Sequence, residues 1–411
     1  MQKNKKAILS TITHRSKLKY FQLVLILGFL TALGPFSIDM YLPGFSGIAA
    51  DLNTTVAKVA MTLSSYFIGI SAGQLLYGPL LDRYGRKKPL FIGLLVYILA
   101  SLGCAFVTDI DTFIGLRFIQ AVGSCAATVA SIAMVRDLFP VKEIPKVLSL
   151  LMLVVGLSPM LAPTIGGYVT AAYGWHVVFL ILMGIGIVIL LAAQFGLPHT
   201  FEPDTSISLK PKPIILNFWS VTREPQFYTY AFTGAIAFSG LFTYVAASPI
   251  LFMDIFKVDA KTYGWIFAFM SLSFISASQL NSLLLRKFSS EQMIFGALIT
   301  QSVISITFLI AAMNGLLGLY ETIGMLFIFL ACLGISNPNT AALTLAPFSK
   351  NAGSASALMG AIQLGLGAFA SFAVGVFVKD SMVPMVVIMM VSTIAALVVL
   401  IFGRRKITVK Y

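Results

Sequence analysis

The stretch Gly78-Pro-Leu-Leu-Asp-Arg-Tyr-Gly-Arg-Lys-Lys88 places five charged side chains within eleven residues of an otherwise apolar chain. The flanking stretches 58–80 and 88–107 are almost wholly apolar. Each is about 20 residues long, the length that a helix needs to cross the hydrocarbon core of a bilayer. Charges this dense cannot lie in hydrocarbon. The stretch therefore predicts a short polar loop at a membrane face, between two membrane-spanning helices.

The composition of the whole chain favours the same interpretation. Of its 411 residues, 58% are hydrophobic and only 10% are charged, and the mean hydropathy is +0.93. A water-soluble domain of this size could not cover its surface with so few polar groups. The stretches 21–33 and 386–400 are continuously apolar rather than alternating, which favours helices over the strands of a membrane barrel. We expect an all-α integral membrane protein.

Apolar windows predict two sets of six spans on either side of a polar, proline-rich stretch. Two equal halves are typical of a duplicated transporter. The expected spans are 20–43, 58–80, 88–107, 111–136, 147–170, 175–197, 227–253, 261–286, 291–313, 321–343, 353–378 and 382–403.

The distribution of Lys and Arg predicts the orientation. If the N-terminus is cytoplasmic, 23 of the 28 basic residues are assigned to inside segments and four to outside loops, and only Arg117 is assigned to no loop. The net charge of +13 then reports topology and gives no reason to expect nucleic-acid binding. The expected organisation is a cytoplasmic tail (1–19), a six-helix bundle (20–198), a central cytoplasmic loop (199–226), a second six-helix bundle (227–403) and a cytoplasmic tail (404–411).

No pattern in the sequence indicates an enzyme or a metal site. Cys104, Cys125 and Cys332 fall inside expected spans without the spacing of metal ligands, and we interpret them as small packing residues. The three histidines are far apart, and neither a nucleophile arrangement nor a phosphate-binding glycine loop is present. We expect no catalytic residues, no metal and no cofactor.

Two ionisable residues fall well inside expected spans, Asp39 in the first and Arg117 in the fourth. These spans run in opposite directions, so at 1.5 Å per residue both side chains lie roughly 6–9 Å below the outer face and can meet. A charge there costs at least about 2.5–3.5 kcal/mol unless it has a partner or a water-filled cavity. One hypothesis is that Asp39 exchanges a proton while Arg117, which cannot lose its own, acts as a fixed counter-charge. The alternative is a static pair that pins two helices, or side chains that reach toward the nearby interface.

The charged loop resembles the loop 2–3 signature of the major facilitator superfamily at its characteristic positions. Three further segments, 117–123, 156–167 and 352–363, together with Ile38-Asp-Met-Tyr-Leu-Pro43, are similar to the twelve-span drug:proton antiporters of the bicyclomycin-resistance/CflA type. The resemblance extends from the first span to the eleventh. It departs at Ala162, where the antiporter motif usually has Gly before Pro, and at Arg286, which stands where the first half has Asp82.

The resemblance implies a proton-coupled antiporter, with Asp39 and Arg117 at its coupling site, that exports small organic compounds by alternating access. Protons would be its coupling ion. We expect it to work as a monomer in the lipid of a bacterial cytoplasmic membrane. Export of an endogenous metabolite such as a siderophore is an alternative that the sequence leaves open. A proton-coupled nutrient importer is a less favoured alternative, because the fifth span resembles that of antiporters.

The charged loop has a second possible role as a conformational latch. Gly85 permits a tight reversal, Asp82 could accept hydrogen bonds at the start of the eleventh span, and Arg83 or Arg86 could pair with Asp137. Such contacts would hold the two halves together on the inner side and would break for inward opening. The alternative is a solvated basic loop that only fixes topology. The residues assigned to the latch are Gly78, Asp82, Arg83, Gly85, Arg86 and Asp137.

The fifth span carries the motif that resembles those of antiporters. Pro159 and Pro163 each remove a backbone hydrogen bond and are expected to bend the helix, while Gly156, Gly166 and Gly167 allow a neighbour to approach closely. A bent, tightly packed helix suits a seal on one side of a rocking transporter. An inert kink is the alternative.

Contacts with the transported compound are expected at polar and aromatic residues at cavity depth. A cavity of this kind, with one carboxylate, suits amphipathic or cationic organic molecules. For each residue, packing within the bundle is the alternative role, and Asn337-Pro338-Asn339 is also expected to interrupt the tenth span. The candidates are Phe36, Tyr41, Gln120, Tyr244, Asn337 and Gln363.

Overall fold

The computed structural model describes residues 17–140, 143–198, 218–219, 221–348, 352–378, 381–405 and 407. Within these residues it is helical and holds twelve helices that are long and apolar enough to cross a membrane. The twelve expected spans are thus confirmed. The division into bundles at 199–226 stays a prediction, because most of that stretch lies outside the described residues.

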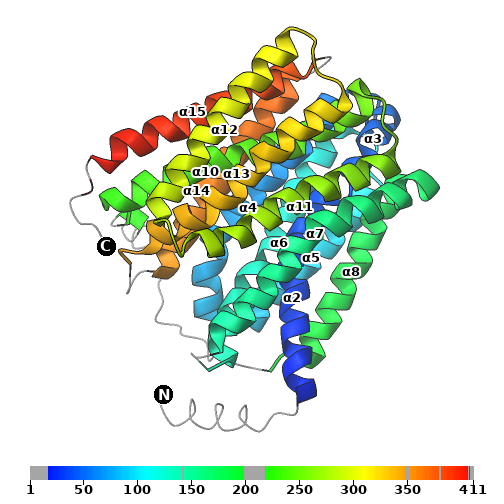
Figure 1. Cartoon of the computed structure of the whole chain (residues 1–411). Coiled ribbons are helices and arrows are strands. Elements are labelled where there is room, and N and C mark those ends of the chain that lie inside the picture. Colours follow the sequence, from blue (N-terminus) through cyan, green and yellow to red (C-terminus); the bar gives the residue numbers. More distant parts are fainter. Residues whose placement is uncertain are drawn as a thin grey trace.

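The first set contains α2 (Lys17–Asp39), η1 (Leu42–Gly44), α3 (Phe45–Asp51), α4 (Val56–Tyr84), α5 (Lys87–Ala105), α6 (Ile110–Leu138), α7 (Ile144–Tyr173) and α8 (Trp175–Gly196). The second set contains α10 (Pro225–Pro249), the π-helical turn η2 (Ile250–Ile255), α11 (Ala260–Leu284), α12 (Ser290–Met313), α13 (Leu319–Leu345), α14 (Ala352–Phe377) and α15 (Val383–Arg404). The start of α2 and the end of α15 lie away from α3, and the two sets come together toward α3 (Figure 1).

Small residues let the helices of the first set pack closely. A Cβ atom on Gly69 would lie 2.7 Å from the carbonyl oxygen of Phe118, and one on Gly123 would lie 2.6 Å from the backbone nitrogen of Tyr97. Close backbone approach of this kind drives helix association in membranes, where water provides no hydrophobic force between helices. Cys104, Cys125 and Cys332 are buried, in keeping with their interpretation as packing residues.

Two expectations about individual helices are wrong. The first span was expected to continue as one helix to residue 43, but α2 ends at Asp39, and the chain then turns into η1 and the short α3. The tenth span was expected to be interrupted at Asn337-Pro338-Asn339, but α13 continues through Pro338 to Leu345. A proline removes one backbone hydrogen bond, and neighbouring helices can compensate for that loss within a membrane.

The two sets of helices contact each other along α4 and α14, along α7 and α11, and near α3. The Ser71 hydroxyl of α4 donates to the carbonyl of Ala361 in α14 at 3.0 Å, and α7 packs along α11. Near α3, the Ser46 hydroxyl donates to the Asp254 carboxylate of η2 at 3.1 Å. The Ser46–Asp254 bond and the packing of η1 on α11 join the two sets near α3, beyond the end of α2.

Candidate transport site and gating contacts

Asp39 is the last residue of α2 and lies where the membrane-embedded backbone stops being helical. Its side chain is buried, with 5% of the residue exposed. Within the described part of the chain its carboxylate forms no ion pair and no hydrogen bond. Asp39 is therefore a buried acid with open hydrogen-bonding capacity.

The expected ion pair between Asp39 and Arg117 is not formed in the structure. Arg117 is fully buried, and its guanidinium donates to the Ser37 carbonyl at 2.9 Å and to the Gln120 side-chain oxygen. It also lies 4.2 Å from the ring centres of both Tyr41 and Tyr66.

The reason is that α2 ends at Asp39. The last carbonyl groups of a helix have no partner within it, and the helix dipole makes that end negative. Arg117 satisfies one of these groups, the Ser37 carbonyl, and so acts as a cap of α2. The guanidinium thus binds the backbone at the end of α2 rather than the acid.

Two buried tyrosines of the second set lie near Asp39. Asp39 lies within electrostatic range of the phenols of Tyr244 in α10 and Tyr263 in α11. The Tyr263 hydroxyl is bonded to that of Ser248 at 2.8 Å. The Tyr244 hydroxyl is buried without a partner in the described structure, while its ring stacks on Phe267. Sequence reasoning missed Tyr263, because an aromatic residue at a helix end is also typical of a membrane interface.

The six candidates for substrate contact fall into separate places. Tyr41 and Gln120 are buried in the Arg117 cluster, where Tyr41 bonds to Thr62 and Gln120 donates to Ser101. Phe36 packs at the margin of the hydrophobic core, and Tyr244 lies near Asp39. For Tyr41 and Gln120 this geometry fits a packing role.

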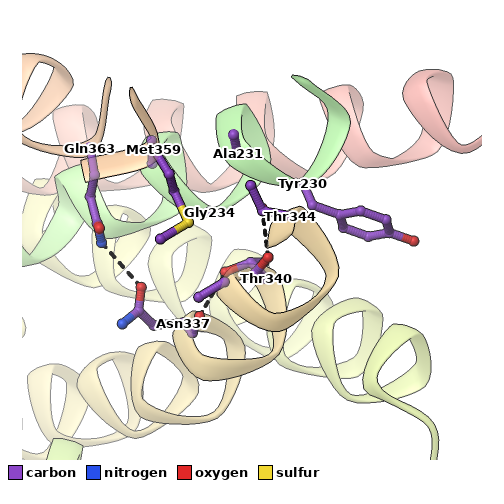
Figure 2. Close-up of a pocket in the computed structure, with 10 residues that line it drawn as sticks. Tyr230, Ala231, Gly234, Asn337, Thr340, Thr344, Met359 and Gln363 are labelled. Carbon is purple, nitrogen blue, oxygen red and sulfur yellow. Dashed lines mark hydrogen bonds between the residues drawn. The ribbon is translucent and has the colours of Figure 1, made fainter. Parts of the chain in front are cut away.

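Asn337 and Gln363, the remaining two candidates, meet in the second set. The Gln363 amide donates to the Asn337 side-chain oxygen at 3.1 Å. Figure 2 shows the two side chains pointing toward one another beside Met359 and Gly234. They border a small cavity of about 10 Å³. Its lining residues are Tyr230, Ala231, Gly234, Ala235, Asn337, Thr340, Ala341, Thr344, Met359 and Gln363.

The charged loop after α4 forms one of the contacts that the sequence predicts: Arg86 donates to the Asp137 carboxylate at 2.9 Å. Arg86 also forms an ion pair with Asp82, which was not predicted from the sequence. Gly85 has φ +81°, a conformation that glycine adopts without strain, and it lets the chain reverse between α4 and α5. Arg83 lies beside the Tyr84 ring, and among the described residues no neighbouring helix comes within 4 Å of the position that a Cβ atom on Gly78 would take. The expected contact of Asp82 with the start of α14, and the latch itself, stay predictions.

Helix α7 contacts both the turn that follows Asp39 (residues 40–41, called the Asp39 turn below) and the second set. A Cβ atom on Gly166 would clash with the carbonyl oxygen of Met40, the residue after Asp39, and one on Gly167 would clash with the carbonyl of Ala260. Further along, Ser271 donates to the Pro159 carbonyl at 3.3 Å. Pro163 lies against Gly264, and Gly156 is in ordinary contact with Ile275. The glycines of the antiporter-like motif thus face two different partners.

The described structure combines twelve candidate membrane spans with a buried acid at the end of α2. A model of the Major Facilitator Superfamily matches residues 27–372. The chain belongs to the major facilitator superfamily.

Relatives cover nearly the whole chain. A bicyclomycin resistance protein homolog of Haemophilus influenzae is 33% identical over 89% of this chain and 92% of its own. The uncharacterized transporter YdgK of Bacillus subtilis is 33% identical over 90% of this chain and 92% of its own. The multidrug resistance protein MdtL of Escherichia coli is 30% identical over 88% of this chain and 94% of its own.

Solved structures show the same fold at low sequence identity. A D-xylose–proton symporter superposes with a TM-score of 0.74 at 14% identity, covering 92% of this chain and 97% of its own. A bacterial homolog of the human lysosomal transporter Spinster gives 0.71 at 14% identity, covering 95% and 96%. At this identity the match concerns the fold alone.

Proposed function

We propose that this transporter is a proton-coupled antiporter that exports small amphipathic organic compounds across a bacterial cytoplasmic membrane, with both termini on the cytoplasmic side. The observation that carries the proposal is Asp39, a buried carboxylate at a helix break that forms no ion pair in the described structure. The names of the relatives, which refer to bicyclomycin and multidrug resistance, support drug-like compounds as cargo.

Asp39 fits the role of proton carrier because its carboxylate has no ion-pair partner among the described residues. A charged side chain in the centre of a bilayer costs about 2.5–3.5 kcal/mol on insertion scales, so an unpaired carboxylate there is a functional candidate. Arg117 cannot exchange a proton, and it is already engaged by Ser37, Gln120 and two tyrosine rings. Asp39 therefore takes up or releases its proton as the surrounding helices change their arrangement.

The packing contacts of the Asp39 turn couple the environment of the acid to movement of the two sets of helices. The turn packs on Gly166 of α7, and the next residue, Gly167, packs on the start of α11 in the second set. A shift between the two sets therefore changes what surrounds the acid. Such a shift is the basis of alternating access in transporters built from two repeats.

The proposal is tested in everted membrane vesicles from a host that lacks its own drug exporters. We expect an imposed proton gradient, acidic inside, to drive accumulation of an amphipathic cation such as ethidium. We also expect that adding ethidium to these acid-loaded vesicles releases protons from them. Vesicles without the protein are the control. Co-uptake of protons with the compound would indicate an importer, and transport indifferent to the gradient would contradict proton coupling.

A further inference from the structure

Two pairs of amide side chains involve α13 at positions only two residues apart, on different faces of one turn, and their surroundings differ. The Asn339 amide donates to the Asn281 side-chain oxygen at 2.7 Å, and both residues are buried, at 1% and 4% exposed. The Gln363 amide donates to the Asn337 side-chain oxygen at 3.1 Å, and both of these residues are partly exposed. The first pair serves packing between α11 and α13, while the second borders a cavity.

The cavity beside Asn337 and Gln363 is small, polar on one side and uncharged. Its volume of about 10 Å³ accommodates roughly one water molecule in this conformation. Met359 and Ala231 supply apolar walls, and the Asn337–Gln363 pair supplies the polar edge (Figure 2). None of the ten lining residues carries a charge.

Asn337 and Gln363 keep unused hydrogen-bonding capacity. A side-chain amide has two N–H donors and an oxygen with two lone pairs, and the bond between them uses one donor and one lone pair. The Asn339 amide, by contrast, also donates to the Ile335 carbonyl at 2.8 Å. Within the described structure the Asn337–Gln363 pair makes no second side-chain bond of this kind.

The unused donors and acceptors of this pair suit one kind of chemical group on a bound compound. The pair offers donors and acceptors side by side, whereas a carboxylate needs donors alone and an ammonium group needs acceptors alone. A carboxamide or a hydroxyl group, which both donates and accepts, matches the pair. Sites built to hydrogen-bond such a group reject analogues that lack it, because the polar groups of the site are then left unpaired.

We propose that Asn337 and Gln363 form a specificity subsite that binds an uncharged carboxamide or hydroxyl group of the transported compound, with an adjoining apolar part against Met359. This subsite rests on the proposed export function for its biological meaning. It does not depend on proton coupling, because binding there is a property of the second set of helices.

Binding of three matched fluorescent probes to the purified protein in lipid nanodiscs, without a proton gradient, tests the subsite. The probes are 2-naphthamide, N,N-dimethyl-2-naphthamide, which lacks the donor, and 2-isopropylnaphthalene, which lacks both donor and acceptor. We expect 2-naphthamide to bind about 3- to 10-fold more tightly than 2-isopropylnaphthalene, the effect of one net hydrogen bond. N,N-dimethyl-2-naphthamide should fall between them.

Substitution of the pair should remove this discrimination. In Asn337→Leu and in Gln363→Leu the three probes should bind with similar affinities. Asn339→Leu is the matched control: it breaks the buried pair, and it should lower thermal stability while keeping the order of affinities. Equal binding of the three probes to the unmodified protein, binding of none of them, or discrimination that survives both Leu substitutions would overturn the subsite.

Failure of the proposed function would look different. Probe binding in nanodiscs is measured without a proton gradient, whereas the antiport proposal is tested by gradient-driven export in vesicles. If probe discrimination is present but no gradient-driven export occurs in vesicles, the subsite stands and the antiport proposal fails.

Discussion

At the scale of single residues, the decisive arrangement is that Arg117 caps a helix and leaves Asp39 without a counter-charge. The guanidinium binds the Ser37 carbonyl at the end of α2 and lies between the rings of Tyr41 and Tyr66. A cation at the C-terminal end of a helix and a cation over an aromatic face are both stabilising. Arg117 thus has a structural role that does not require the acid.

Arg117→Lys tests that structural role. Lysine keeps the charge but cannot reach two acceptors with a planar fork or stack on two rings, so the free energy of unfolding should fall by about 1–3 kcal/mol. Thermal unfolding of the purified protein measures this. Arg286→Lys, on an exposed turn, is the control and should change little. Unfolding of Arg117→Lys at the original temperature would show that the cap contributes nothing.

The two tyrosines near Asp39, Tyr244 and Tyr263, should respond differently to loss of their hydroxyl groups. Tyr244→Phe removes a buried hydroxyl that has no partner in the described structure, so stability should stay the same or rise. Tyr263→Phe breaks the bond to Ser248 and should cost about 0.5–1.5 kcal/mol.

The measurement for the tyrosines is thermal unfolding of both variants, combined with the pH profile of export. If the Tyr244 hydroxyl contacts Asp39 during the transport cycle, Tyr244→Phe shifts that profile without loss of stability. A destabilised Tyr244→Phe variant with an unchanged pH profile would assign this hydroxyl to packing.

At the scale of elements, the sequence predicted the helices well and their ends less well. Long apolar stretches separated by charged or proline-rich loops are sufficient to predict twelve spans, because hydrocarbon excludes charge. The break at Asp39 could not be predicted in this way. At this break the Met40 carbonyl packs against Gly166, which is more than 120 residues away and belongs to another helix, so the local sequence does not report the contact.

Helix α7 is the element that links the acid to the second set, and Gly167 tests that link. In Gly167→Ala the added methyl group meets the Ala260 carbonyl, so α7 and α11 must separate where the two sets touch. We expect reduced export with nearly normal folding of the first set. Efflux from cells at matched expression levels measures this.

Gly184→Ala in α8 is the matched control for Gly167→Ala, because no atom lies within 4 Å of the position that its Cβ would take. It should leave export unchanged. Normal export by Gly167→Ala would argue against close α7–α11 packing as part of the transport cycle.

At the scale of the whole molecule, the candidate site is divided between the two sets of helices. The first set holds Asp39 and the end of α2 that Arg117 caps. The second set holds Tyr244 and Tyr263, which lie near Asp39, and the Asn337–Gln363 pair. Sequence patterns identified Asp39, Arg117 and the amides as unusual residues in spans. They could not show which residues meet. Gln363 and Asn337 lie on different helices, and Arg117 could have bound either the Asp39 carboxylate or the backbone at the end of α2.

The most direct test of the account is the response of Asp39→Asn reconstituted in liposomes. Asparagine has a similar shape but cannot carry the proton. We expect this variant to exchange labelled ethidium for unlabelled ethidium across the membrane while losing accumulation driven by a pH gradient and substrate-induced proton release. Full gradient-driven accumulation by Asp39→Asn would contradict proton carriage by this residue.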